Sequence, residues 1–328
     1  MRYLVTGSTG FIGPFLVKKL ISSGHSCRCL VRSVSKANNI LEPGVELIEG
    51  DITDKSTLIG IASGIDAVFH LATLGHTHNF DTPQEMFHQV NVRGTMNIMY
   101  EALDSGVKKV VHCSSVAAMG ICKDIPSNEE SECLPHHPYG ESKLGAEKEV
   151  IRLVTDKGLP AVIIRFSMVY GPGDRRDILK LTRLVKKGLI PRIGKGTKLT
   201  PLIHVKDAVN GLILAMERGK TGEIYLITNA RSEPFDNIIK IIKEVLGVSS
   251  LSIPVPEWAA LFTASVIEWM SKILGKTPAV TRKNIESTIA DRIFSIEKAK
   301  RELGFKPIID PEKGLRDTVL WYMKNGWI

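Results

Sequence analysis

The sequence has few cysteines, and their spacing does not suit a metal site or a disulfide framework. There are five, an odd number, and no two of them form a Cys-x-x-Cys pair. Cys27, Cys29 and Cys113 fall in expected strands, and the other two are Cys122 and Cys133. We therefore expect reduced thiols in or near the core, with no structural disulfide and no metal site.

The sequence also lacks an apolar run long enough to cross a membrane. Its most apolar segment, residues 256–274, is interrupted by Glu257, Glu268 and Lys272. We favour a lid helix that packs on the rest of the protein, and a helix lying in a membrane interface is the alternative. A glycine-rich loop begins at residue 7, which leaves no room for a signal peptide, so we expect a cytoplasmic protein.

Features of nucleic-acid binding are absent, although the formal net charge is +8. We find no nucleic-acid module and no pattern of aromatic and basic residues for base stacking, and we expect no nucleic-acid partner. Between Arg175 and Lys198, nine Lys or Arg residues accompany one acidic residue, Asp177. This segment is either a solvated helix face or an anion-binding rim for a phosphate-bearing substrate, such as a nucleotide sugar or a CoA ester.

Apolar runs alternate with helical stretches along the 328 residues, and 43% of the chain is hydrophobic. This alternation predicts an α/β fold, a doubly wound parallel sheet of the Rossmann type with helices on both faces. We expect helices over roughly 11–23, 86–105 and 139–155. The expected strands are 3–6, 27–31, 45–49, 67–71, 109–113, 161–165 and 224–227.

Two regions follow from this pattern. Residues 1–167 are expected to form the dinucleotide-binding domain. Residues 168–328 mix helices, short strands and proline-marked loops, and are expected to form a smaller α/β lid over the substrate. The two regions are interleaved, because the strand at about 224–227 is expected to return to the sheet.

A glycine-rich turn separates the first expected strand from the first expected helix. Gly7, Gly10 and Gly13 give the spacing Gly-x-x-Gly-x-x-Gly. Gly7 can adopt a backbone geometry closed to other residues, Gly10 lets a pyrophosphate approach the main chain, and Gly13 lets the helix pack on the strand. A strand, this turn and a helix at the N-terminus predict a dinucleotide site.

Tyr139 and Lys143 lie four residues apart in an expected helix, which places them one turn apart on the same face. A phenol is a weak acid at neutral pH, since its ordinary pKa is about 10. A neighbouring ammonium favours the phenolate, so we expect Lys143 to lower the pKa of Tyr139. Tyr139 could then exchange a proton with a substrate hydroxyl or carbonyl.

The chain resembles the extended short-chain dehydrogenase/reductase family, also called the NAD-dependent epimerase/dehydratase family. The resemblance is strongest to its dihydroflavonol-reductase and 3β-hydroxysteroid-dehydrogenase branch. It extends over nearly the whole chain. The motifs that carry it, besides those above, are Gly50-Asp51-Ile52, His70-Leu71-Ala72, Asn91-Val92-Arg93-Gly94-Thr95, Ser114-Ser115, Tyr170-Gly171-Pro172-Gly173, His204-Val205-Lys206-Asp207 and a C-terminal segment, residues 299–305.

The resemblance implies a set of cofactor-binding residues. Asp51 and Ile52 would flank the adenine, and Asn91 would fix the cofactor or a nearby backbone kink. His70 is expected to be hydrogen-bonded in place and to have no catalytic role. The full expected set is Gly7, Thr9, Gly10, Phe11, Ile12, Gly13, Arg32, Asp51, Ile52, Leu71, Ala72, Asn91, Tyr139 and Lys143.

Arg32 indicates which dinucleotide is preferred. An enzyme that uses NAD has an acidic residue near the end of the second strand, and this chain has none there. Arg32 is instead placed to pair with a 2′-phosphate, with Ser33 and Lys36 nearby. We therefore predict NADP over NAD, and an Arg32 that stacks on the adenine or faces solvent is the alternative.

The resemblance also gives the catalytic set, Ser115, Tyr139 and Lys143. Ser115 would hydrogen-bond the substrate oxygen beside Tyr139. Arg175 and Met168 are the further expected substrate contacts, together with Ser115. Met168 replaces an asparagine that many nucleotide-sugar enzymes have in the segment before Tyr-Gly, and a thioether suits an apolar pocket.

Two other departures from the family narrow the function. Val116 and Ala117 occupy positions that are Asp-Glu in nucleotide-sugar dehydratases, so a dehydratase is disfavoured. Met119 replaces the tyrosine usual before Gly120, which also indicates a less polar substrate. The basic segment 175–198 indicates the opposite, and the sequence leaves this conflict open.

These observations predict an enzyme, an NADP(H)-dependent oxidoreductase that interconverts a ketone and a secondary alcohol with Tyr139 as the acid/base. One alternative is a nucleotide-sugar epimerase that retains NAD. A second is a non-catalytic dinucleotide sensor, which would not need Ser115, Tyr139 and Lys143 together. Family members often pair through the helices that begin near residues 86 and 139, so we expect a homodimer.

Overall fold

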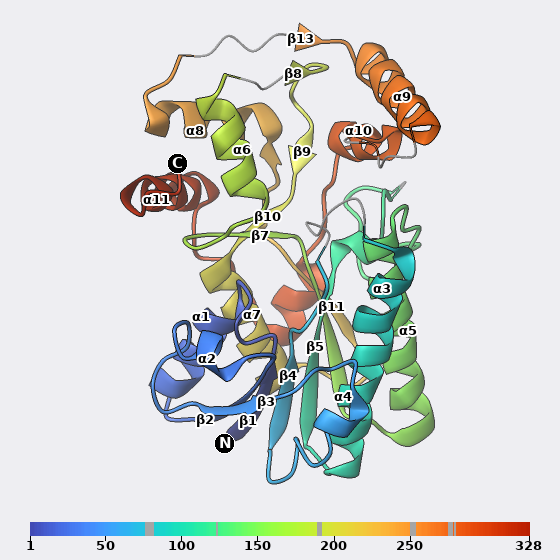
Figure 1. Ribbon diagram of the computed structural model, residues 1–328, viewed down its shortest axis with the longest axis vertical. Helices are drawn as coiled ribbons and strands as arrows, with labels where there is room; N and C mark the ends of the chain where they lie inside the picture. The colour runs from blue at the N-terminus through green and yellow to red at the C-terminus, as the bar shows by residue number, and fades with distance from the viewer. Residues whose placement is uncertain (76–81, 123, 189–191, 250–253, 275–277, 279) are drawn as a thin grey trace.

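The computed structural model describes residues 1–75, 82–122, 124–188, 192–249, 254–274, 278 and 280–328. Its centre is a seven-stranded sheet in the order β11-β6-β5-β4-β1-β2-β3, seen in the lower half of Figure 1. All paired neighbours in this sheet are parallel. Strand order reverses between β1 and β4, which is the switch point of a doubly wound fold. The strands are β1 (Arg2–Thr6), β2 (Ser26–Val31), β3 (Glu46–Glu49), β4 (Ala67–His70), β5 (Lys109–Ser115), β6 (Ala161–Phe166) and β11 (Ile224–Ile227).

Helices cover both faces of the sheet, as predicted (Figure 1). One core contains strand residues such as Val5 and Val111, packed with α1 and α7. The other contains Leu4 and Val110, packed with α4 and α5. The strands are apolar on both faces because both faces are buried. The helices are α1 (Gly13–Ser22), α2 (Val34–Ala37), α3 (Gln84–His88), α4 (Gly94–Asp104), α5 (Pro138–Lys157) and α7 (Val205–Arg218).

Two expected helices differ from the observed ones. The first begins at Gly13 rather than at residue 11, so Phe11 and Ile12 belong to the glycine-rich turn. The helix expected over 86–105 consists of α3 and α4 joined by a π-helical segment, Gln89–Arg93. Each hydrogen bond in such a segment spans one residue more than in an α-helix, so a pattern with α-helical periodicity cannot reveal it.

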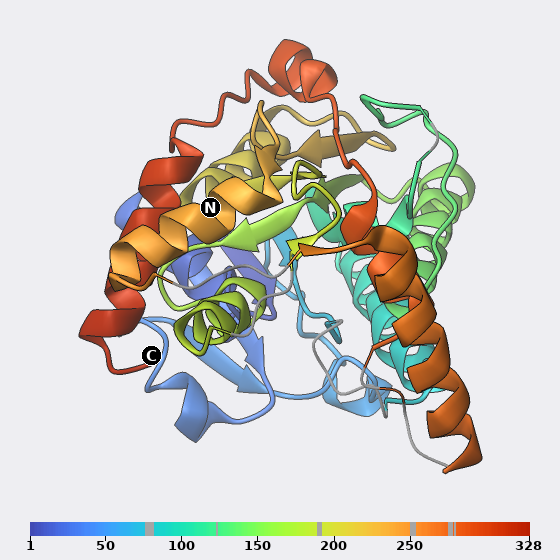
Figure 2. The same ribbon diagram turned by 90° about the horizontal axis from the view of Figure 1, so that it is seen from above.

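Most of the C-terminal half forms a second lobe above the carboxyl ends of the strands, and we call this lobe the lid (Figures 1 and 2). In the lid, α6, α8 and α11 share a separate core. The two halves are interleaved, because α7, β11 and residues 299–305 return to the core around the sheet. The lid elements are β7 (Met168–Tyr170), α6 (Asp177–Lys186), β8 (Arg192–Ile193), β9 (Leu199–Thr200), β10 (Leu202–His204), β12 (Glu233–Pro234), α8 (Phe235–Leu246), β13 (Pro254–Val255), α9 (Glu257–Ile273), α10 (Arg282–Ile289) and α11 (Pro311–Lys324).

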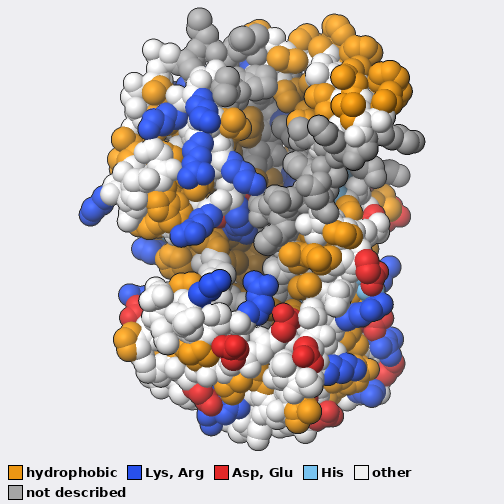
Figure 3. All heavy atoms as spheres, in the orientation of Figure 1, with side chains coloured by type: hydrophobic (Ala, Val, Ile, Leu, Met, Phe, Trp, Pro, Cys, Tyr) orange, Lys and Arg blue, Asp and Glu red, His pale blue; other side chains and the backbone are white. Residues whose placement is uncertain are grey.

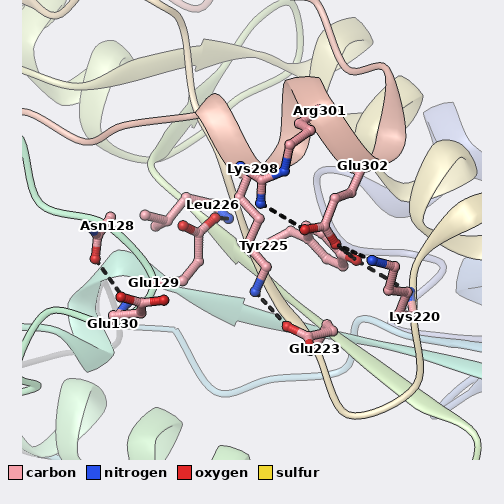
Figure 4. Close-up of polar contacts among 10 residues, drawn as sticks. All are labelled: Asn128, Glu129, Glu130, Lys220, Glu223, Tyr225, Leu226, Lys298, Arg301 and Glu302. Carbon is pink, nitrogen blue, oxygen red and sulfur yellow. Dashed lines mark hydrogen bonds and ion pairs between the residues drawn. The ribbon is translucent and has the colours of Figure 1, made fainter.

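The outer edge of β11 is covered by segments from distant parts of the sequence (Figure 4). The backbone N–H of Leu226 donates to the Glu129 carboxylate at 2.9 Å. Lys298 forms an ion pair with Glu223 at 2.6 Å, and the hydroxyl of Tyr225 donates to Glu302 at 3.0 Å. An uncovered edge strand can pair with another chain, and these contacts cover this one.

Helix α9 contains most of the apolar segment that the sequence singles out. It packs against α10, but its largest side chains are exposed, which differs from the packed helix that the sequence favoured. Across the portion of the chain that the structure describes, none of the helices combines the length and the apolar character that crossing a membrane requires.

Candidate active site

The glycine-rich turn lies against the loop that follows β4. Gly7 has φ +68°, and a Cβ there would lie 2.6 Å from the Ala72 nitrogen and from the Leu71 carbonyl carbon. A Cβ on Gly13 would lie 2.4 Å from the Ser8 carbonyl oxygen. Only glycine fits at either position. The N-terminus of α1 has no side-chain cap, so its backbone N–H groups are available to an anion. This cradle fits the pyrophosphate of a dinucleotide.

His70 lies at the end of β4 and is fully buried. Its Nδ1 lies 2.7 Å from the Thr6 hydroxyl and its Nε2 lies 3.0 Å from the Thr95 hydroxyl. Burial, with a smaller contribution from the charge of Lys143, lowers the pKa of His70 to about 3. The imidazole is therefore neutral and hydrogen-bonded at both nitrogens, which agrees with the structural role expected for it.

The structure brings Ser115, Tyr139 and Lys143 together at the carboxyl end of β5. Ser115 is the last residue of β5, and its hydroxyl accepts from the Ala117 N–H at 3.1 Å and shares a hydrogen bond with Tyr139. Lys143 lies one turn after Tyr139 on α5, is buried, and donates to the Cys113 carbonyl at 2.5 Å. A serine, a phenol and an ammonium thus converge at the carboxyl edge of the sheet, the same edge from which the glycine-rich turn leaves β1.

The pKa of Tyr139 differs from the sequence-based expectation. Burial raises it above the ordinary value, and the hydrogen bond to Ser115 and the positive charge of Arg176 oppose this effect. Burial also lowers the pKa of Lys143, to about 8. Tyr139 is therefore a protonated phenol at neutral pH, ready to donate a proton.

The first turn of α5 is fixed by a residue to which the sequence assigned no role. His137 is the N-cap, and its Nδ1 accepts from the Gly140 N–H at 2.9 Å. Its ring is nearly parallel to that of Tyr139, with centroids 6.1 Å apart, and Phe87 meets Tyr139 edge-on at 6.5 Å. Histidine is not among the usual N-cap residues, so capping preferences gave no signal for it.

Asn91 lies in the π-helical segment and uses both ends of its amide. Its oxygen accepts from the Leu74 N–H at 2.7 Å and from the Thr73 hydroxyl at 3.0 Å. Its nitrogen donates to the Leu74 carbonyl at 3.1 Å and to the Ser142 hydroxyl at 2.9 Å. Asn91 therefore ties the loop after β4 to α5, and its direct contact with a cofactor remains a prediction.

A buried ion pair lies beneath the three candidate catalytic residues. Glu147, one turn beyond Lys143 on α5, pairs with Arg165 of β6 at 2.7 Å, and both side chains are only 3% exposed. The hydroxyl of Ser114 also donates to Glu147. This cluster connects α5 to β5 and β6 next to Ser115.

The structure distinguishes two adjacent arginines that the sequence could not. Arg175, the expected substrate contact, is exposed and its guanidinium lies 4.9 Å from the ring centroid of Trp327. Arg176 lies 5.0 Å from the ring centroid of Phe11 in the glycine-rich turn. It is held by Asp174 at 2.8 Å and by the Val169 carbonyl at 3.0 Å. Arg176 therefore connects the lid to the cofactor-binding loop beside Tyr139.

We expect Arg176→Gln to shift the pH dependence of alcohol oxidation toward higher pH. Oxidation requires the phenolate of Tyr139, and removing a nearby positive charge raises the pKa of that phenol further. The measurement is the pH profile of kcat. Arg175→Gln is the matched control, with an unchanged profile expected. Equal shifts in the two variants would contradict the conclusion that Arg176, and not Arg175, acts on the pKa of Tyr139.

Other expected site residues have less definite surroundings. Arg32 is exposed directly after β2, Asp51 accepts from the Thr53 N–H at 2.8 Å, and Ile52 is buried against α4. Met168 begins β7 and is half-buried. Met119 is fully buried in a small core cluster with Leu226 and Phe294, so it fills space and does not line a pocket.

The basic segment is mainly a solvated face. Lys180, Arg183 and Lys186 lie exposed along α6, while Arg192 pairs with Asp236 at 2.7 Å. Among the residues that the structure describes, we find no group of three His, Cys, Asp or Glu side chains placed to hold a metal ion.

Comparisons with known proteins agree with this geometry. The ketoreductase of Stigmatella aurantiaca that acts on 4-hydroxy-2-methyl-3-oxo-4-farnesyl-3,4-dihydroquinoline-1-oxide is 28% identical, over 96% of this chain and 95% of its own. The UDP-glucose 4-epimerase of Vibrio cholerae is also 28% identical, over 98% and 95%. The crystal structure of gox2253 is 32% identical and superposes with a TM-score of 0.87, covering 100% of this chain and 99% of that one.

Dihydroflavonol reductase and 3β-hydroxysteroid dehydrogenase also occur among the names of curated relatives, which agrees with the branch that the sequence resembles. The model of the NAD-dependent epimerase/dehydratase family matches residues 3–228. The chain therefore belongs to the NAD-dependent epimerase/dehydratase family, and it is an NAD(P)-dependent enzyme of the extended short-chain dehydrogenase/reductase type.

Proposed function

We propose that the protein is an NADP(H)-dependent oxidoreductase that interconverts a ketone and a secondary alcohol. The observation that carries the proposal is the Tyr139 phenol, protonated at neutral pH, hydrogen-bonded to Ser115 and influenced by Arg176, which lies over Phe11 of the glycine-rich turn. A protonated phenol is the form that a carbonyl reduction consumes.

In this proposal the bound nicotinamide supplies or accepts the hydride. Ser115 hydrogen-bonds the carbonyl oxygen and orients the reacting carbon. Tyr139 donates its proton to that oxygen as negative charge develops there, and in the reverse direction its phenolate removes the alcohol proton. Lys143, whose pKa is about 8, carries a positive charge over most of the neutral range and favours the phenolate once the proton has left.

The preference for NADP rests on Arg32. No acidic residue directly follows β2 in the sequence, and Arg32 is exposed there, although the Glu49 carboxylate of β3 accepts from the Val34 N–H at 3.2 Å in the same loop. We expect Arg32→Glu to weaken NADPH binding by at least about tenfold, since a charged hydrogen bond contributes ~1.5–3 kcal/mol. NADH binding should change little. Titration calorimetry measures both, with the remote exposed Arg152→Glu as the control. Equal losses of affinity for NADPH and NADH would contradict the assignment of Arg32 to the 2′-phosphate.

The epimerase is the second candidate, supported by the similarity to the Vibrio cholerae enzyme. An epimerase would use the same three residues and would keep its NAD between turnovers. Mass spectrometry of nucleotide released from the denatured protein distinguishes the two. Stoichiometric NAD would favour the epimerase. An empty protein that binds NADPH and oxidises it with an added ketone would support the reductase.

The substrate proposed is an apolar ketone, since Met168 cannot donate a hydrogen bond and most of the basic segment faces solvent. A non-catalytic sensor remains the least favoured function, because binding a dinucleotide does not require Ser115, Tyr139 and Lys143 together. A homodimer through α4 and α5 also stays a proposal, as does the division of the chain at residue 167.

A further inference from the structure

Helix α9 turns its large apolar side chains outward. Trp258, Phe262 and Trp269 are 72%, 66% and 65% exposed, whereas the buried positions are Ala260 and Ala264. This arrangement is the reverse of an ordinary surface helix, which buries its large apolar side chains. We call the exposed set the apolar stripe, and its members are Trp258, Phe262, Val266, Trp269, Met270 and Ile273.

The stripe is a continuous surface on one side of the helix. Its members are separated by one, three or four residues, the spacing of a single helical face. The acidic residues of α9, Glu257 and Glu268, are half-buried and lie outside it. Figures 1 and 2 both place α9 at the outer rim of the lid. A patch of this kind on a protein surface commonly marks an interaction site.

Charge indicates what this surface meets. Residues 168–328 carry 27 Lys or Arg and 17 Asp or Glu, a net charge of +10, whereas residues 1–167 have a net charge of −2. In Figure 3 the apolar side chains of α9 lie on the upper lobe and Lys and Arg side chains appear on both lobes, while the visible Asp and Glu lie mainly on the lower lobe. The stripe therefore belongs to the positively charged half of the molecule.

We propose that the apolar stripe of α9 binds the surface of an anionic phospholipid bilayer. Trp and Phe side chains would enter the headgroup region, and the positive lid would face the anionic lipids. A second copy of the chain is a poorer partner, because pairing through α9 would bring two lids of +10 together. The helix would lie along the surface, in keeping with its inability to span a membrane.

The test is sedimentation of the full-length protein with vesicles of phosphatidylcholine alone or with 30% phosphatidylglycerol. We expect binding to the anionic vesicles that is at least about tenfold stronger than to the neutral ones and that weakens in 0.5 M NaCl. Tryptophan emission should shift to shorter wavelength on binding, because two of the four tryptophans lie in the stripe. Brominated lipids should quench that emission.

The triple variant Trp258→Gln, Phe262→Gln, Trp269→Gln should lose most of this binding and keep its fold, since all three side chains are exposed. The control is Ile59→Gln with Ile308→Gln, two exposed apolar residues outside α9, for which unchanged binding is expected. Absence of vesicle binding, or equal binding by the triple variant, would overturn the proposal. So would a wild-type oligomer whose mass falls in the triple variant, because the stripe would then join copies of the chain.

Discussion

Tyr139→Phe should lower kcat by about 10²–10⁴-fold, the contribution that a positioned acid or base typically makes. The ring would remain between His137 and Phe87, so the change removes only the hydroxyl that Ser115 contacts. Cofactor affinity should stay within a factor of two or so, because the glycine-rich turn is untouched. Steady-state kinetics and NADPH titration on the same preparation separate the two effects.

Tyr100→Phe is the matched control for this substitution. Tyr100 lies on α4 outside the site, where Lys157 lies over its ring at 5.1 Å. It should keep full turnover. Turnover in Tyr139→Phe comparable to that of the control would rule out Tyr139 as the proton donor, whereas loss of cofactor binding would indicate that the fold of the site had been disturbed.

Glu147→Ala should destabilise the protein by roughly 3–5 kcal/mol, which is the cost of leaving a buried charge without its partner. Arg165 has its shortest side-chain hydrogen bonds with Glu147, and Ser114 would lose its acceptor as well. Urea unfolding, followed by the midpoint and slope, measures this change. Activity should fall in parallel, because the pair connects α5 to β5 next to Ser115.

Two comparisons make this result specific. Glu149→Ala breaks an ion pair with Arg152 of the same 2.7 Å length on the same helix, but at the surface, and should cost less than about 1 kcal/mol. The double variant Glu147→Leu, Arg165→Met should recover most of the lost stability, since apolar residues of similar volume can replace a buried pair. A loss for Glu147→Ala no larger than for Glu149→Ala would contradict the argument.

Most of the fold and the three candidate catalytic residues could be predicted from the sequence, because they depend on local patterns. Gly7 and Gly13 stand at positions where any Cβ meets backbone atoms, and the apolar strands need no distant information. What could not be predicted depends on packing between distant segments. The pKa of Tyr139 is raised mainly by burial among residues from several elements.

The two arginines at the start of α6 illustrate the same limit. Arg175 and Arg176 are identical in type and adjacent in sequence, and only the backbone direction before Asp177 determines which one faces Phe11. The exposure of the large side chains of α9 could not be predicted for the same reason. Its sequence is apolar enough to pack, and only the three-dimensional arrangement shows that alanines, and not tryptophans, occupy the contact with the rest of the lid.

The covered edge of β11 has a consequence for synthesis on the ribosome. Roughly sixty residues separate the end of β6 from the start of β11, and Lys298 and Glu302, which complete the cover that Glu129 begins, come some seventy residues after β11. At ~5–20 residues per second, the edge of β6 stays unpaired for several seconds as the chain emerges, and that of β11 then stays only partly covered for a similar time. The nascent N-terminal half therefore presents an unprotected strand edge, prone to aggregation, until most of the lid has been made.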